Sequence, residues 1–182
     1  MKKLLSIFLI VGIACVAFPR EASAASSATF NITVTVNFME MQIVQYDQAW
    51  DGTTYTAWAI GSIATSVTST MTESDGVKVA LGSTSQTIDI QSYVSNEGAA
   101  WTVDAAAAAD KYAIMSKGYS ATQVSPSVAS GTQLTTSAQD VTGATAVASG
   151  ADTWLYYDFD SPTSVATGAE QTIVITVAIV AA

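Results

Sequence analysis

The sequence predicts an all-β protein, built as an antiparallel β-sandwich of immunoglobulin-like or jelly-roll type. Three observations lead to this expectation. Apolar and polar residues alternate in several short segments, the alternating residues are largely β-branched, and pairs such as Asp51-Gly52, Gly82-Ser83 and Ser161-Pro162 separate the segments. Many short strands divided by turns are typical of a sandwich rather than of a βαβ fold.

The first 24 residues have the pattern of a secretory signal peptide. Met1-Lys2-Lys3 is basic, the run from Leu4 to Phe18 is apolar, and "PREASA" ends in the Ala-x-Ala pattern at Ala24. The apolar run is shorter than the ~20 residues that span a bilayer. We therefore expect cleavage after Ala24, a single β-sandwich domain over residues 25–182, and no stable membrane span after cleavage.

The expected mature chain is strongly acidic. It has three lysines and no arginine against fourteen carboxylates, which gives a formal charge of −11. Nucleic acids and anionic membranes require clustered Lys and Arg, so neither is expected as a partner. Since Cys15 leaves with the signal, no disulfide is expected. The predicted location is extracellular or at the surface of a bacterial-type cell, with the periplasm as the alternative.

The first expected strand follows the signal almost at once, at Ala28–Gln45. One of its faces carries five apolar residues at every second position, separated by Asn and Thr: Phe30, Ile32, Val34, Val36 and Phe38. Further strands are expected at Ala57–Ile63, Val77–Leu81, Gln86–Val94, Trp101–Asp104, Ala144–Ala148 and Thr153–Phe159.

The last expected strand, Thr172–Ala181, has a continuous apolar face made of Ile173, Ile175, Val177 and Ile179. Its other face is also apolar from Val174 onward. A strand with this pattern is expected to be buried on both faces or to be covered by a neighbour.

The segment from Asp104 to Gly118, "DAAAAADKYAIMSKG", fits two structures. It could be one short helix over residues 104–117, with Asp104 as the N-cap and Gly118 just past the end. Alternatively, it could be a hairpin that turns at Ala108-Ala109-Asp110, with Tyr112, Ile114 and Ser116 alternating beyond the turn. Helix propensity favours the first structure and the surrounding strands favour the second.

The residue types needed for most catalysis are missing. The sequence has no histidine, and the expected mature chain has no arginine or cysteine, which excludes Ser-His-Asp and Cys-His arrangements. Asp158 and Asp160 could form a carboxylate pair for glycoside hydrolysis, because residues two apart on a strand share a face. Solvated aspartates beside a turn are the favoured interpretation, so we expect no enzyme activity.

No cofactor is predicted. Calcium, which takes six to eight oxygen ligands, could use Asp47, Asp51 and Gly52, or Glu73 and Asp75. Neither stretch has the spacing of an EF-hand loop, and Asp-Gly pairs commonly satisfy turn geometry alone.

A cluster of aromatic residues offers an alternative function. Trp50, Tyr55 and Trp58 surround a predicted turn, and side by side on the surface they would form a sugar-stacking platform. The chain would then be a secreted carbohydrate-binding module with a polysaccharide partner. The competing interpretation is that these rings fill the core of the sandwich.

The two terminal strands favour self-association. Neither contains lysine or proline, which normally protect exposed sheet edges from pairing with another chain. Either they are inner strands of their own sandwich or a neighbouring subunit completes them by β-strand addition. Pairing between subunits would make the protein a homo-oligomer or homopolymer.

The layout also resembles a known group of proteins. A signal peptide, an alternating strand directly after cleavage, "VSNEGAAWTVDA" in the middle and "SPTSVATGAEQTIVITVAIV" at the end are similar to secreted β-sandwich subunits of surface filaments, as in TasA-type biofilm fibres and donor-strand pilins. The resemblance implies a subunit that polymerises by lending its N-terminal strand to the next subunit. The expected function is therefore an exported, non-enzymatic structural protein that self-associates in a cell-surface or extracellular filament or matrix.

Overall fold

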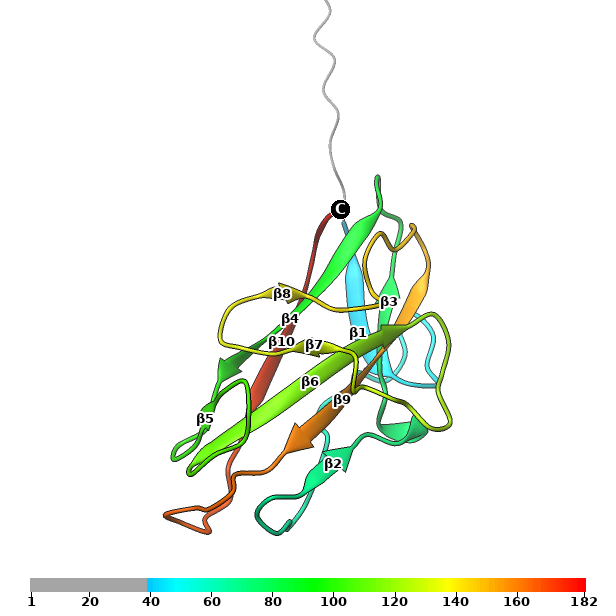
Figure 1. The fold of residues 1–182 in the computed structure, drawn as a ribbon. Coiled ribbons are helices and arrows are strands. Elements are labelled where there is room, and N and C mark those ends of the chain that lie inside the picture. The colour runs from blue at the N-terminus through cyan, green and yellow to red at the C-terminus, as the bar shows by residue number, and fades with distance from the viewer. Residues whose placement is uncertain (1–38) are drawn as a thin grey trace, which may run out of the picture. The chain divides into compact units, whose positions relative to one another are not determined.

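A computed structural model describes residues 39–182 as ten strands and one short 3-10 helix, arranged in two sheets (Figure 1). The first sheet has the order β1-β3-β9-β6-β5, with β2 beside β9 and β7 beside β6, and the second has the order β10-β4-β8. The elements are β1 (Met41–Gln45), β2 (Thr68–Thr70), η1 (Glu73–Asp75), β3 (Val77–Leu81), β4 (Ile88–Asn96), β5 (Thr102–Val103), β6 (Lys111–Tyr119), β7 (Thr132–Gln133), β8 (Gln139–Asp140), β9 (Asp152–Asp160) and β10 (Val174–Ala181).

Strand β9 organises the first sheet. One of its edges pairs with β3 and, further along, with β2, while the other edge pairs with β6. These pairings are antiparallel. Strand β5 is different, because it runs parallel to β6 with Thr102 opposite Lys111. The first sheet is therefore mixed, and the expectation of an entirely antiparallel fold is wrong for this pair.

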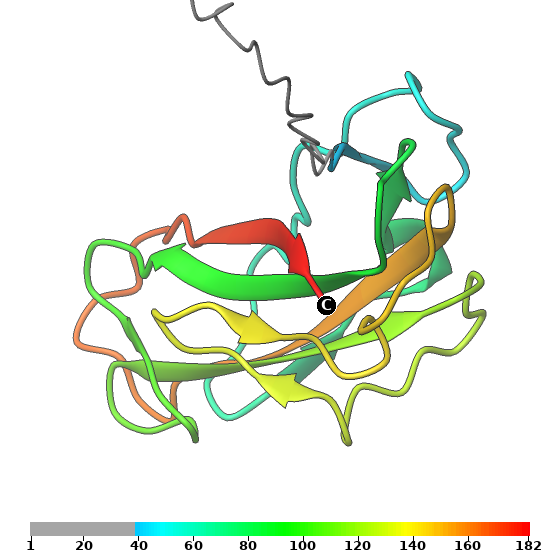
Figure 2. The ribbon, with the colours of Figure 1, turned by 90° about the horizontal axis from the view of Figure 1, so that it is seen from above.

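The second sheet is antiparallel. Strand β4 pairs with β10 from Ile88 opposite Ala181 to Asn96 opposite Val174, with an irregularity between Val174 and Ile175. Figure 2 shows β10 (red) on one side of β4 (green) and the yellow segment that carries β7 and β8 on the other side.

One hydrophobic core draws side chains from both sheets. The alternation of β4 places Ile88, Ile90 and Val94 in it, each at most 1% exposed. From the first sheet, Val79 and Leu155 contribute side chains with no exposed surface. The all-β expectation is confirmed, because the alternating apolar faces found in the sequence are the faces that meet in this core.

The helix considered for residues 104–117 is not formed, so that alternative is wrong. The chain turns at Ala108, which exchanges backbone hydrogen bonds of 3.0 and 3.2 Å with Lys111, and Asp110 in this turn has a φ of 54°. Strand β6 follows the turn, as the hairpin alternative required, but the short strand before the turn, β5, runs parallel to β6, so the first strand of the expected hairpin is not formed. Seven residues of β6 pair with β9, so long-range pairing prevails over the helix propensity of the alanines.

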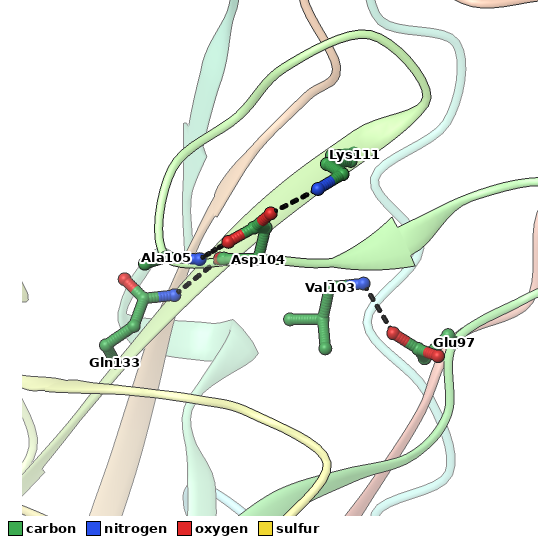
Figure 3. Close-up of polar contacts among 6 residues, drawn as sticks. All are labelled: Glu97, Val103, Asp104, Ala105, Lys111 and Gln133. Atoms are coloured by element: carbon green, nitrogen blue, oxygen red, sulfur yellow. Dashed lines mark hydrogen bonds and ion pairs between the residues drawn. The ribbon is translucent and has the colours of Figure 1, made fainter.

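The carboxylate of Asp104 is engaged in this turn and does not cap a helix (Figure 3). It accepts hydrogen bonds from the Lys111 ammonium at 2.6 Å and from the backbone N–H of Ala105 at 2.7 Å. Nearby, the Gln133 amide donates to the backbone carbonyl of Asp104, and Glu97 accepts from the backbone N–H of Val103 at 2.7 Å. These contacts connect β5, the turn and β7.

The other expected strands are found to different extents. Strands close to the expected bounds occur for Val77–Leu81, Gln86–Val94, Thr153–Phe159 and Thr172–Ala181, whereas Trp101–Asp104 contributes only the two residues of β5. Residues 57–63 form no strand, which corrects that expectation, and Ala144–Ala148 contributes a single bridge between Val147 and Ile88. Of the first expected strand, only Met41–Gln45 is observed, and residues 28–38 lie outside the described part of the chain.

Candidate functional site

The free edge of β10 is the candidate site for association. Strand β10 pairs with β4 along its whole length, and among residues 39–182 no strand pairs with its other edge. An eight-residue strand with an uncovered edge presents a row of backbone N–H and C=O groups to any incoming strand.

The second edge of β4, on the opposite side of the same sheet, is covered. Backbone hydrogen bonds join Ile88 to Val147, Ile90 to Ala144 and Val141, and Val94 to Thr135, with donor–acceptor distances of 2.8–3.0 Å. Residues 135–147 therefore close this side of the sheet, although only β8 within them is a regular strand.

The same segment also closes the first sheet. Leu134 donates its backbone N–H to the carbonyl of Ile114 on β6 at 2.8 Å, and the carbonyl of the next residue, Thr135, accepts from Val94 on β4 at 2.9 Å. Two consecutive residues thus bind strands of different sheets. The side chain of Leu134 has no exposed surface.

The outer edge of β1 is partly covered as well. The chain returns after a loop, and residues 53–55 pair with β1 through Gln45 N–H to the Thr53 carbonyl at 3.0 Å and Tyr55 N–H to the Ile43 carbonyl at 3.2 Å. Among the described residues, β10 is therefore a long strand with one edge that makes no backbone pairing of this kind.

The side chains of β10 reflect this difference. Ile175, Val177 and Ile179 pack against the core, yet all three are half-buried, whereas Ile88, Ile90 and Val94 on the neighbouring strand are at most 1% exposed. Ile173, just before β10, also packs against the core and is half-buried. The core is consequently accessible along the β10 edge, where one more apolar strand would cover it.

No charge protects this edge. Residues 171–182 contain no Asp, Glu, Lys, Arg or Pro. The acidic residue opposite Val180 is Asp89, and its carboxylate already accepts a hydrogen bond from the Ala146 N–H at 2.7 Å. The edge therefore lacks the charged side chains and prolines by which many monomeric proteins avoid strand pairing.

The expected association residues Ile173, Ile175, Val177 and Ile179 thus lie at this edge, whereas Phe30, Ile32, Val34, Val36 and Phe38 lie outside the described residues. Two backbone hydrogen bonds locate both ends of the described chain, because the Glu40 carbonyl accepts from the N–H of Gly82 and the Ala182 N–H donates to the carbonyl of Thr87. Because residues 82–87 form the short link between β3 and β4, β1 starts at the same end of the fold at which β10 ends.

The three aromatic residues of the alternative site have different surroundings. Tyr55 and Trp58 are half-buried and pack against the core, and burial raises the pKa of Tyr55. Trp50 is half-buried over Gly82, where an added β-carbon would come within 3.0 Å of its ring. Two of the three rings therefore contribute to the core.

The two aspartates of the carboxylate pair lie opposite threonines of β2. Asp158 pairs with Thr70 and Asp160 with Thr68, whose hydroxyl donates to Asp160. Burial raises the pKa of Asp158, and the charge of Asp160 adds to this effect, while a hydrogen bond from Thr70 opposes it. One oxygen of Asp158 is buried without a hydrogen-bond partner.

Two of the carboxylates considered for calcium, those of Asp51 and Asp75, make local hydrogen bonds. Asp51 exchanges two bonds of 2.7 Å with the side chain of Gln42, and Asp75 accepts from the backbone and hydroxyl of Thr72. Within residues 39–182, no three His, Cys, Asp or Glu side chains gather where they could hold a metal ion.

A charged group buried beside the first sheet was not anticipated from the sequence. The Lys78 ammonium lies 2.7 Å from Asp152, donates to the carbonyl of Gln48 at 2.8 Å and lies 5.1 Å from the centre of the Trp154 ring. The Trp154 indole donates to the carbonyl of Tyr46 at 2.7 Å. The hydrogen bonds donated by the Lys78 and Trp154 side chains hold the 46–52 loop on the first sheet. The only sequence signal is one lysine in the apolar run "VKVAL".

Comparison with protein-family models, with curated proteins and with solved structures finds no match to this chain. No helix among the described residues is long and apolar enough to cross a membrane. Residues 39–182 are thus defined by their own features, as a β-rich fold with two sheets around one core and an uncovered edge on the long strand β10.

Proposed function

We infer that this protein is an exported, non-enzymatic structural subunit that self-associates at the cell surface or in an extracellular filament or matrix. The observation that carries this proposal is the uncovered edge of β10, next to a core that is accessible along that edge. In this proposal the two sheets form a β-sandwich of immunoglobulin-like or jelly-roll type, and residues 1–24 direct export and are removed.

The chemistry of the edge supports pairing between copies of one chain. A strand added to β10 would satisfy its free backbone groups, and its apolar side chains would cover Ile175, Val177 and Ile179. The same chain supplies a segment of this kind in Phe30–Phe38, so a homopolymer needs no second protein. Without histidine, the chain also lacks the residue most used in general acid–base catalysis.

The proposal is tested by blocking the edge with a single charge. The full-length chain is produced in a host that exports it, and its mature form is examined by size-exclusion chromatography with light scattering and by electron microscopy. Wild-type protein is expected to form oligomers or filaments. Ala178→Lys places an ammonium on the β10 edge, and it should give monomers because edge lysines prevent strand addition.

Thr145→Lys is the matched control, since Thr145 is exposed on the segment that covers the closed side of β4. It adds the same charge and should assemble as the wild type does. Circular dichroism of both variants verifies that they fold. Strictly monomeric wild-type protein at high concentration, unchanged by deletion of residues 25–38, would contradict the proposed function.

A further inference from the structure

We propose that the free edge of β10 pairs antiparallel with β10 of a second copy, across a two-fold axis that passes through Val177. The inference rests on the proposed self-association and adds to it the partner strand, its direction and its register. It is argued from the direction of the backbone groups of β10, from the near-symmetry of its sequence and from the absence of charge along it.

The backbone groups of β10 alternate between β4 and the free edge. At the end of the strand, the N–H of Ala182 points to β4, since it donates to the carbonyl of Thr87 at 3.1 Å. In an antiparallel ladder only every second residue bonds to a given neighbour. The even-numbered residues of β10 therefore bond to β4, and the N–H and C=O groups of Ile175, Val177 and Ile179 point to the free edge.

Strand β4 supports the same assignment from its other side. Ile88 and Ile90 use their backbone groups to bond to residues 141–147, so the residue between them, Asp89, directs its backbone groups to β10. Asp89 lies opposite Val180, an even-numbered residue of β10. The residues of β10 that have free backbone groups are therefore the same residues whose side chains pack against the accessible core.

The sequence of β10 reads almost the same in both directions from Val177. Isoleucines lie two residues away on either side, valines lie three residues away on either side, and the small residues Thr176 and Ala178 lie next to it. When Val177 lies opposite Val177 of the second copy, Ile175 lies opposite Ile179, and both copies turn their apolar side chains to one face. Contacts of this kind across neighbouring strands are what favours β-branched residues in sheets.

The free backbone groups fit this register. Val177 with Val177, and each Ile175 with Ile179 of the other copy, would exchange two backbone hydrogen bonds, about six in all. A shift by one residue would turn the apolar face of one copy outward. A shift by two residues, with Ala178 on the axis, would place the small Ala181 opposite Ile175 and leave that isoleucine less covered.

No charge opposes this contact between two acidic subunits. Residues 171–182 carry no charged side chain. The nearest acidic residue on β4, Asp89, directs its carboxylate away from β10, to the Ala146 N–H at 2.7 Å. Three strand spacings, about 14 Å, would separate the two Asp89 residues across the joined sheets, which exceeds the Debye length of about 8 Å at physiological salt.

Pairing of β10 with itself also satisfies both open edges in a single contact. A two-fold contact uses the same surface on both copies, so neither is left with an open β10 edge. One sheet would then run through both copies in the order β8-β4-β10-β10-β4-β8. The dimer is the unit from which a larger assembly would be built.

Disulfide trapping tests the inference, because Thr176 and Ala178 of different copies lie opposite each other in this register. Thr176→Cys, Ala178→Cys and the double variant are made in a Cys15→Ser background of the full-length chain. The two positions form a non-hydrogen-bonded pair, whose Cα atoms are about 4.5 Å apart, a distance that a disulfide spans. After mild oxidation, most of the double variant should run as a covalent dimer on a non-reducing gel.

The two single variants are the matched controls. In each of them the cysteines of the two copies lie diagonally across the strands, about 7–8 Å apart, which is too far for a disulfide. Both should therefore run as monomers on the same gel. Circular dichroism verifies that all three variants fold, and size-exclusion chromatography with light scattering gives the oligomeric state of the wild type.

A covalent dimer from Ala178→Cys alone would overturn the inference, because Ala178 would then lie on the axis. A ladder of larger linked species from the double variant would also overturn it, since a closed pair does not link a third copy. If the double variant stays unlinked while the wild type forms oligomers, a segment other than β10 occupies the edge, so the inference fails and the proposed function survives. Strictly monomeric wild type without linked dimers in any variant would contradict both.

Discussion

The hydroxyl groups of Ser92 and Tyr157 lie 3.2 Å apart in the core, and their hydrogen bond joins β4 of one sheet to β9 of the other. Ser92 is fully buried and Tyr157 is 2% exposed, so water does not replace the bond if one partner is lost. Between two sheets held mainly by apolar contacts, this pair fixes which residues of β4 face β9.

Removal of both hydroxyls of this pair should destabilise the protein by less than the sum of the two single removals. Ser92→Ala or Tyr157→Phe leaves one buried hydroxyl without a partner, which costs about 1–3 kcal/mol. The double variant should lose less stability than the sum of the single variants. Urea denaturation of the four proteins in a double-mutant cycle measures the difference, and strictly additive losses would contradict a direct bond.

Burial raises the pKa of Tyr157 to about 12, from an ordinary value of 10.0. A folded-state pKa above the unfolded one means that stability is complete below pH 10 and is lost as the pH rises from about 10 to about 12. Tyr157→Phe removes this contribution. Its unfolding free energy should therefore decline less steeply with pH over that interval, as followed by urea denaturation, and a curve parallel to the wild type would contradict the assignment.

Asp158→Asn should stabilise the protein at neutral pH. Burial is the main cause that raises the pKa of Asp158, so its charged form is less favourable in the folded state than in the unfolded chain. Wild-type stability should accordingly decrease as the pH rises from 3.8 through the higher folded-state pKa of Asp158. Thermal melting from pH 3 to 7 should show a smaller decrease for the asparagine variant, and an unchanged profile would argue against a buried carboxyl.

Lys78→Met should release the 46–52 loop from the first sheet. The substitution keeps much of the side-chain length but removes the contacts with Asp152 and the Gln48 carbonyl, at a cost of about 1–3 kcal/mol. Limited proteolysis should then cut within the loop sooner than in the wild type. Lys111→Met is the control, because the Lys111–Asp104 pair is exposed and its loss should leave that loop as resistant as before.

Added salt should not dissociate the assembled protein. The β10 edge, residues 171–182, contains no charged side chain, while a subunit without residues 1–24 would have a formal charge of −11. Screening of the repulsion between like-charged subunits should favour association between 0.05 and 0.5 M salt, roughly the range over which the Debye length falls from above 10 Å to about 4 Å. Light scattering at fixed protein concentration measures this effect, and dissociation by salt would point to an interface of ion pairs instead.

The alternation of apolar and polar residues was sufficient to predict the strands that line the core. Alternation predicted β4, β9 and β10 closely, because residues facing a shared core must be apolar at every second position. It left the segment after Asp104 undecided, because five alanines favour a helix while Tyr112, Ile114 and Ser116 alternate, and the pairing of β6 with β9 decides for the strand. Pairing with a strand some forty residues away is not encoded in local propensity.

The candidate site was predictable only in part. The absence of charge and proline at Ile173–Ile179 indicated an unprotected strand, but the sequence could not tell an inner strand from an edge. That distinction depends on residues 134–147, which lack strong alternation. They nevertheless cover β4 through hydrogen bonds made by residues such as Leu134 and Val147, and they leave β10 as the uncovered strand.

The sequence by itself determined the all-β class of the described residues, the acidic composition of the chain and the uncharged, apolar character of β10, because these depend on residue type and on a period of two. The tertiary structure decided the order of the strands, the parallel position of β5 and which edge stays open. The strand order and the open edge depend on hydrogen bonds between residues far apart in the chain. A backbone N–H has the same chemistry in every residue except proline, so its partner is decided only when the sheets assemble.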